Sequence, residues 1–468
     1  MVFDQVFKRF IELRPISVMH RAVLENVFAA EKLDAVFHAS AVKQYERELL
    51  FSTTVEVMSL VVARIAPSVR NAYFQKLDEV SVTVRSLYDK LAHVEPATSR
   101  ALLRHTAIQV SELIHCVEGS KRSPLPGYRV LTLDGCHPEG TEHRLGVLRD
   151  TAAGALPGLS LVLLDVQKML AIDAVLCEDG HAQERSLLDE ILPSIGKGDV
   201  VIDDRNFCTR KFLAGIAFRR KAYFITRQHA RMPWTPEGKR RYVGQGSTGR
   251  VYEQAGHVID PETGRQLAVR RITVKLKTAT RDGDREIHLL TNLPKKVGGV
   301  KVAELYRGRW TIEQVFNELT THLCCEPNTL GYPKAALFAF SVALCCYNLL
   351  SAVKGVLRGV HGEKTVDSEV SNYFLAEEIS RVYDGMMIAL PPANWQDFQA
   401  MTAAQLGKHL RHWAKQIDLT KYPKHKRGPK RPRPRRPNAQ FQHVSTARLL
   451  AAVREKRKQR QRKAICTA

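Results

Sequence analysis

A run of nineteen residues without a charged side chain, AALFAFSVALCCYNLLSAV at 335–353, places the strongest constraint on the fold. An apolar segment of this length must leave water, either in a bilayer or in a protein core. The run is rich in alanine, contains Ser341, Asn348 and Ser351, and has no second hydrophobic segment to pair with it in a membrane. We therefore expect a helix buried in the core of a soluble protein, with a membrane span as the alternative.

The distribution of charge indicates a polyanionic partner. The net charge of the 468 residues is +23, and residues 421–468 alone hold seventeen Lys or Arg against one acid, Glu455. A surplus of this size favours nucleic acid, with an anionic membrane or a merely solvated tail as alternatives. Within the tail, the proline-rich run at 423–437 cannot build a core and is expected to be disordered, and 446–463 has the composition of a basic helix that forms on a polyanion.

The cysteines indicate a reducing compartment. The count of nine is odd, no two are spaced as CxxC, and the N-terminal stretch MVFDQVFKRFIELRP has no apolar signal-peptide core. Zinc sites of the usual spacing are therefore not expected, and we predict reduced thiols and a cytoplasmic, nucleoid-associated protein.

Hydrophobic periodicity divides the chain into six parts. Apolar residues at three- and four-residue intervals predict helices over 1–122, and short Val-, Leu- and Ile-rich runs such as RVLTLDG and GDVVIDDRNF predict strands of a mixed sheet over 123–227. Residues 228–295 read as strands joined by Gly- and Asp-containing turns, and helices resume over 296–355 and 356–420 before the basic tail, 421–468.

The stretch LYRGRWTIEQVFNEL, 305–319, reads as a helix with two adjacent stripes. At about 100° per residue, apolar residues fill one arc and polar ones the next. The apolar arc holds Leu305, Ile312, Val315, Phe316, Leu319 and Leu323, and the polar arc holds Tyr306, Arg309, Glu313, Asn317 and Thr320. By itself, this pattern is that of an ordinary surface helix with solvated charges.

Carboxylates at two strand ends suggest a second interpretation of the polar stripe. Asp134 follows the apolar run LTL, and Asp203 and Asp204 follow VVI; because side chains alternate along a strand, only one of that pair can share a face with a given neighbour. An Asp at a strand end is usually a turn or cap residue. Together with Glu313, however, such carboxylates could hold two divalent cations for phosphodiester chemistry.

The set resembles the DDE transposases of the insertion-sequence-four family. Tyr306, Arg309 and Glu313 match the family's Tyr-two-Arg-three-Glu signature, with LTNLP before it, LDG at the first Asp and DRNF at the second. The similarity covers roughly 125–355. It implies an α/β fold: an RNase H-like mixed-sheet core (123–227 and 296–355) with a β-rich insertion (228–295), flanked by a helical N-terminal DNA-binding region, a helical C-terminal region and a disordered basic tail. The 109 residues from Asp204 to Glu313 suit such an insertion.

The resemblance also implies a site and a reaction. Asp134, Asp204 and Glu313 would be the catalytic, metal-binding triad for Mg²⁺, with Mn²⁺ able to substitute; Asp204 is chosen because Arg205 follows it. DNA contacts would come from Tyr306, Arg309, Trp310, Thr320 and Arg205. The enzyme would cut double-stranded DNA at terminal inverted repeats and join the 3′-hydroxyl ends to target DNA, as a homodimer in the synaptic complex.

Thr320 departs from the family pattern, which has a Lys seven residues after the Glu. A basic residue from elsewhere could replace that charge. Two alternatives stay open: an RNase H-like DNA nuclease without strand transfer, and a catalytically inactive DNA-binding relative. His143 and Arg144 could also touch DNA, or could belong to a structural loop.

Overall fold

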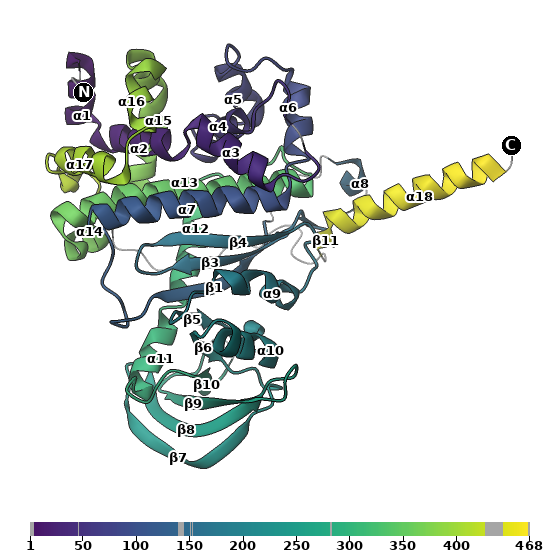
Figure 1. Ribbon diagram of the computed structural model, residues 1–468, viewed down its shortest axis with the longest axis vertical. Coiled ribbons are helices and arrows are strands. Elements are labelled where there is room, and N and C mark those ends of the chain that lie inside the picture. The colour runs from purple at the N-terminus through teal and green to yellow at the C-terminus, as the bar shows by residue number, and fades with distance from the viewer. Residues whose placement is uncertain are drawn as a thin grey trace.

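The protein is described by a computed structural model, which defines residues 4–44, 46–138, 145–149, 151, 153–280, 283–425 and 443–466. Its centre is one mixed sheet of nine strands, in the order β4-β3-β1-β5-β6-β10-β9-β8-β7 (Figure 1).

Five strands that precede residue 228 form the core half of this sheet. β1 pairs antiparallel with β3, which pairs antiparallel with β4, whereas β1, β5 and β6 run parallel. Their bounds are β1 (Val130–Cys136), β3 (Leu159–Asp165), β4 (Leu170–Cys177), β5 (Val200–Asp203) and β6 (Tyr223–Arg227). With helices on both faces, this mixed sheet confirms the predicted α/β, RNase H-like fold class.

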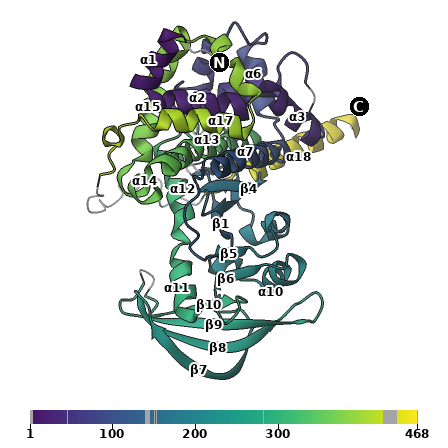
Figure 2. The same ribbon diagram turned by 60° about the vertical axis from the view of Figure 1, so that its left-hand side comes forward.

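The β-rich segment extends the same sheet rather than forming a second one. β10 pairs antiparallel with β6, and β9, β8 and β7 follow outward, at the end of the molecule farthest from the helical body (Figures 1 and 2). These strands are β7 (Thr235–Gln245), β8 (Gly249–Ile259), β9 (Gln266–Leu276) and β10 (Glu286–Thr291).

Helix α13 (Pro333–His361) is the axis of the helical body, and it contains the uncharged run 335–353. Its 18-residue window of highest hydropathy is entirely buried inside the protein, although the helix is long and apolar enough to cross a membrane. The expected buried core helix is therefore confirmed. The thiols of Cys116, Cys177, Cys208, Cys324, Cys325, Cys345 and Cys346 are free.

Helices from both ends of the chain pack around α13 in one continuous hydrophobic core. For example, the backbone N–H of Ser17 donates to Glu378, 361 residues later. The helices of the first part are α1 (Gln5–Leu13), α2 (Pro15–Val27), α3 (Ala30–Ser40), α4 (Phe51–Val62), α5 (Val69–Gln75), α6 (Val84–Leu91) and α7 (Pro96–Cys116). Those after α13 are α14 (Glu363–Glu369), α15 (Asn372–Ala389), α16 (Gln396–Gln399) and α17 (Ala403–Ala414). The predicted division of the chain into domains stays a prediction.

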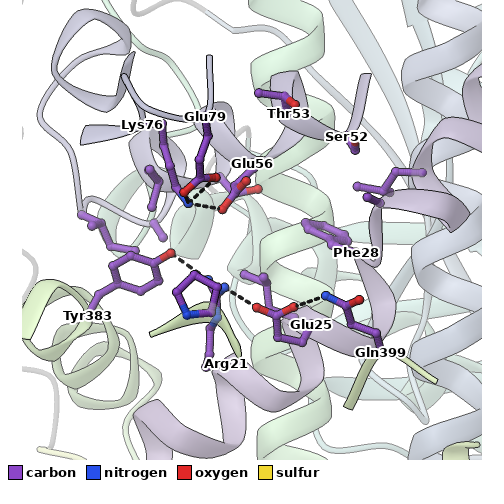
Figure 3. Close-up of a pocket in the computed structure, with 18 of the residues that line it drawn as sticks. Arg21, Glu25, Phe28, Ser52, Thr53, Glu56, Lys76, Glu79, Tyr383 and Gln399 are labelled. Carbon is purple, nitrogen blue, oxygen red and sulfur yellow. Dashed lines mark hydrogen bonds and ion pairs between the residues drawn. The ribbon is translucent and has the colours of Figure 1, made fainter. Parts of the chain in front are cut away.

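A cavity of about 410 Å³ within this body carries a set of paired charges (Figure 3). Arg21 of α2 donates to the Tyr383 hydroxyl at 2.7 Å and bonds Glu25, while Lys76 pairs with Glu56 at 2.6 Å. Buried charges are tolerated when they are paired in this way, so these contacts tie the N-terminal helices to α15.

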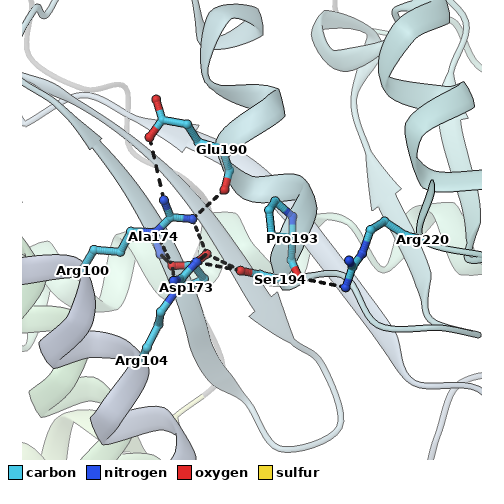
Figure 4. A network of polar contacts seen from close by, with 8 residues as sticks. All are labelled: Arg100, Arg104, Asp173, Ala174, Glu190, Pro193, Ser194 and Arg220. Carbon is cyan, nitrogen blue, oxygen red and sulfur yellow. Dashed lines mark hydrogen bonds and ion pairs between the residues drawn. The ribbon is translucent and has the colours of Figure 1, made fainter. Parts of the chain in front are cut away.

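A second charged cluster fastens the helical body to the sheet (Figure 4). The Asp173 carboxylate of β4 is wholly buried and accepts hydrogen bonds from Arg100 and Arg104 of α7, at 2.7–2.9 Å, and from the Ser194 hydroxyl. Charge-assisted bidentate bonds are stronger and more directional than neutral ones. They fix α7 against β4.

The basic tail is partly ordered, which corrects the expectation of disorder over 421–468. Its end forms a two-residue strand, β11 (Val444–Ser445), which pairs with β2 (Ala155–Leu156), and then the helix α18 (Thr446–Cys466). The expected basic helix is therefore present in the chain alone, because tertiary contacts hold its first turn. Most of the proline-rich run, from residue 426 onward, lies outside the described residues.

Candidate active site

The parallel pairing of β1 with β5 brings the first two candidate carboxylates together. Thr132 lies opposite Ile202, so continuing the register by two residues sets Asp134 beside Asp204. Side chains at matched positions of parallel strands point to the same face, here the face covered by α11 (Gly299–Arg307) and α12 (Trp310–Thr321). Asp204 is the first residue after β5, and its carboxylate accepts the backbone N–H of Asn206 at 2.6 Å.

Asp203 belongs to the opposite face. It lies across from Thr226 of β6 and is wholly buried. Burial raises the pKa of Asp203 well above its usual range. The alternation predicted from the sequence therefore separates Asp203 from Asp204.

The predicted helix over 305–319 is two successive helices, α11 and α12, which follow one another along the sheet (Figure 2). The N–H groups of Gly308 and Arg309 bond the carbonyls of Leu305 and Tyr306, three residues back, and this tightens the backbone between the helices. Glycine is a weak helix former, which explains the break at Gly308. The apolar stripe is buried as predicted, with Phe316 partly covered.

Arg309 joins Asp134 of β1 to Glu313 of α12. Its Nη1 lies 3.1 Å from Asp134 Oδ2 and its Nη2 lies 2.6 Å from Glu313 Oε1. The Arg309 side chain is 12% exposed, against 18% for Asp134 and 42% for Glu313. The cluster is thus partly withdrawn from water but open on the side of Glu313.

The electrostatics of the cluster show that it gathers negative charge. Burial raises the pKa of Asp134 to about 7; the charges of Asp204 and Glu313 add to this rise, while Arg309 opposes it. Removing a cation from this place would leave neighbouring carboxylates repelling one another. The site therefore calls for positive charge, which Arg309 supplies in this structure.

Carboxylate oxygens are the ligands that hard divalent cations prefer, so Asp134, Asp204 and Glu313 fit such an ion by donor type. Over the part of the chain that the structure describes, no group of three or more His, Cys, Asp or Glu side chains is arranged to hold a metal. At this cluster the Arg309 guanidinium lies between two of the three carboxylates. Ion binding would require Arg309 to move outward.

The other residues predicted to contact DNA differ in their exposure to solvent. Tyr306 is partly buried, and burial raises the pKa of its phenol to about 12. Trp310 is 60% exposed, with the Arg309 guanidinium 5.9 Å from its ring centroid, and Arg205 is exposed beside Asp204. These side chains surround the carboxylates. His143 and Arg144 lie outside the described residues.

Thr320 is turned back onto its own helix, where its hydroxyl donates to the Asn317 carbonyl at 3.0 Å. The adjacent cation is Arg64, which follows α4 and donates to the carbonyls of Thr320 and Leu323 at 3.0 Å each. No sequence pattern pointed to Arg64, because it lies 256 residues before Thr320.

Glu184 is a further carboxylate that the sequence reading missed. It accepts a hydrogen bond from the Asn206 side chain, and a Cβ atom on Gly135 would lie 1.9 Å from its Oε1. Glu184 therefore packs against the residue after Asp134 and bonds a residue two positions after Asp204. The glycine in the LDG motif is the one local signal, since it marks a close approach.

Comparison with known proteins relates the chain to transposases. Residues 157–349 match the family model of the transposase DDE domain, a range that includes Asp204 and Glu313 and begins after Asp134. A protein of Sinorhizobium fredii named "Putative transposase y4zB" is 32% identical over 160 residues, which are 34% of this chain and 43% of that protein. The chain thus aligns with less than half the length of this relative. Taken together, the domain match and the relative support a DDE transposase.

Proposed function

We propose that this protein is a transposase of the insertion-sequence-four type that cuts DNA at transposon ends and joins the freed 3′-hydroxyl ends to target DNA. The observation that carries the proposal is that Asp134 and Asp204 lie at matched positions of β1 and β5, and that Arg309 joins Asp134 to Glu313. Such a set of carboxylates fits phosphodiester chemistry better than a structural ion pair, because one carboxyl is held with a raised pKa in a partly open site.

Each residue of this cluster has a distinct role in the proposed reaction. Asp134, Asp204 and Glu313 would hold divalent cations, of which Mg²⁺ is the proposed one and Mn²⁺ a substitute. Held there, such cations would supply the Lewis-acid chemistry that phosphodiester cleavage and transfer need. Arg309, once released from the carboxylates, holds a phosphate of the reacting end through its planar fork.

The surrounding side chains position the DNA. Trp310, the most exposed aromatic here, can stack on an unpaired base, and Arg205 adds a cation beside Asp204. Tyr306 donates a hydrogen bond to the DNA backbone through its hydroxyl, since its raised pKa keeps the phenol protonated at neutral pH. Terminal inverted repeats and a target duplex are the proposed substrates, with two copies of the chain in the synaptic complex.

A joining assay separates the transposase from a nuclease on the same fold. Purified full-length protein is incubated with a pre-cut duplex end bearing a 3′-hydroxyl, a supercoiled plasmid and Mg²⁺ or Mn²⁺, without metal as the control. Plasmid molecules covalently joined to the end support the transposase. Cleavage without joined products would assign a nuclease, and DNA binding without cleavage in either metal would assign an inactive DNA-binding relative, the reading that Thr320 favours.

We further propose that Arg64 supplies the positive charge that Thr320 lacks. Arg64→Ala is expected to lower cleavage about 10- to 150-fold, since one charge-assisted contact contributes about 1.5–3 kcal/mol. Arg64→Lys should recover most of this loss, because it keeps the charge. Cleavage rates of the two variants decide the point. If both lose activity and melting temperature together, Arg64 only caps the end of α12.

A further inference from the structure

The helix α18 extends away from the body with its charges on all sides (Figure 1). Residues 451–462 are all exposed, and they include six cations and one acid, Glu455. The cations are Arg454, Lys456, Arg457, Lys458, Arg460 and Arg462. At about 100° per residue these cations cover about two thirds of the circumference, and Glu455 and Gln459 lie in the remaining sector, so this part of α18 has no apolar face for a protein core or a membrane surface. A polyanion that it can lie along, such as the backbone of a DNA duplex, fits this charge distribution.

The first turn of α18 is fastened to the body by a specific anchor, which we define as Asp179 with Ser445 and Arg448. Arg448 Nε lies 2.9 Å and Nη2 lies 2.8 Å from Asp179 Oδ2, and the Ser445 hydroxyl donates to Asp179 Oδ1 at 2.7 Å. The pairing of β11 with β2 adds backbone bonds beside it. A helix held at its first turn has a defined direction, unlike a charged tail on a linker.

The anchor lies beyond the same ends of the strands as the candidate active site. Asp134 is opposite Val162 of β3, and Val162 is opposite Ala174 of β4. Asp179 comes five residues beyond Ala174, in the direction in which β1 also ends. With strands about 4.8 Å apart and about 3.3 Å per residue, Asp179 lies within about 20 Å of Asp134. One turn of DNA is about 34 Å and α18 is about 30 Å long, so one duplex could reach both.

A short segment connects the anchor to the carboxylates physically. Five residues after Asp179, Glu184 packs against Gly135 and bonds the Asn206 side chain, and Arg185 Nε donates to the Asn206 carbonyl at 2.6 Å. A displacement of the anchor would therefore be transmitted to the residues that follow Asp134 and Asp204.

We propose that α18 binds the backbone of the duplex that is being cut, and that the anchor sets the direction of α18 relative to the active site. The inference rests on the proposed function for the identity of the reacting duplex. It makes α18 a DNA-guiding element of the active site as well as a source of affinity.

The proposal that α18 binds the duplex is tested with a variant that carries Lys456→Gln, Arg457→Gln, Lys458→Gln and Arg460→Gln. Glutamine removes the charge and has a helix propensity close to that of Lys and Arg. The matched control carries Lys364→Gln, Lys408→Gln, Lys415→Gln and Lys421→Gln, four exposed lysines of 364–421. Affinity for a 30-base-pair duplex of arbitrary sequence is measured across several salt concentrations. If all four α18 cations meet phosphates, the slope of log affinity against log salt falls by about 3.6, at about 0.9 per contact. Equal slopes for the two variants would overturn the inference.

The guiding part is tested with Asp179→Asn, which removes the anchor's charge but no cation. We expect unchanged or tighter binding of the arbitrary duplex, but metal-dependent cleavage lowered about tenfold, with the control variant cutting as the wild type does. Cleavage unchanged in Asp179→Asn, at an unchanged melting temperature, would contradict guidance by the anchor. A wild-type protein that never cuts DNA would instead refute the proposed function, while the salt slopes would still decide whether α18 binds the duplex.

Discussion

Asp134→Asn, Asp204→Asn and Glu313→Gln are each expected to lower metal-dependent DNA cleavage by roughly 10³-fold, about 4 kcal/mol of transition-state stabilisation. Each change removes one anionic oxygen from the shared face of β1, β5 and α12 while keeping the side-chain volume. Affinity for duplex DNA should persist, because the exposed cations that bind phosphates are untouched. Cleavage rates and binding isotherms of the same preparations provide the measurement.

Asp203→Asn is the matched control for this series. It removes a carboxyl of the same type from the adjacent position, but on the face occupied by Thr226 and away from Glu313. Burial disfavours the charged form of Asp203 and raises its pKa, so the neutral amide should change cleavage little. An essential Asp203 beside a dispensable Asp204 would show that the proposed assignment of the second carboxylate is wrong.

Arg309→Ala is expected to lower cleavage about 10²-fold while weakening overall DNA binding only slightly, since loss of alignment at the reacting end costs far more than one general contact. Arg309→Lys should recover part of the rate, because it restores charge without the planar fork. An equal loss of rate and affinity would instead make Arg309 one phosphate contact among many.

Arg309→Ala should also change the melting temperature of the protein in the absence of DNA. Without Arg309, Asp134 and Glu313 lose the cation that lies 3.1 Å and 2.6 Å from them, and their repulsion with Asp204 is no longer offset. The melting temperature of Arg309→Ala should therefore fall in a chelating buffer and rise when Mg²⁺ or Mn²⁺ is added, by more than that of the wild type. Identical shifts in both proteins would show that the cation does not bind where Arg309 lies.

Features set by the neighbouring residues could be predicted from the sequence. The absence of charge over 335–353 requires burial, and α13 is buried. The alternation of side chains along a strand separates Asp203 from Asp204, and the apolar spacing around Ile312 and Val315 identifies the core-facing stripe of α12. Local periodicity reports whether a side chain meets water or core, and this information is present in any short window of the chain.

Only the tertiary structure decided which partners these side chains meet. Arg309 reaches Asp134 across 175 residues, Arg64 reaches Thr320 across 256, and Arg448 reaches Asp179 across 269. Periodicity predicted that 305–319 is helical, but not the break at Gly308 or the ion pairs of Arg309. Nor did composition show that the first turn of α18 is anchored. Such contacts depend on strand order and helix packing, which bring distant segments to one sheet edge, and no local pattern of residues encodes the identity of a partner so far along the chain.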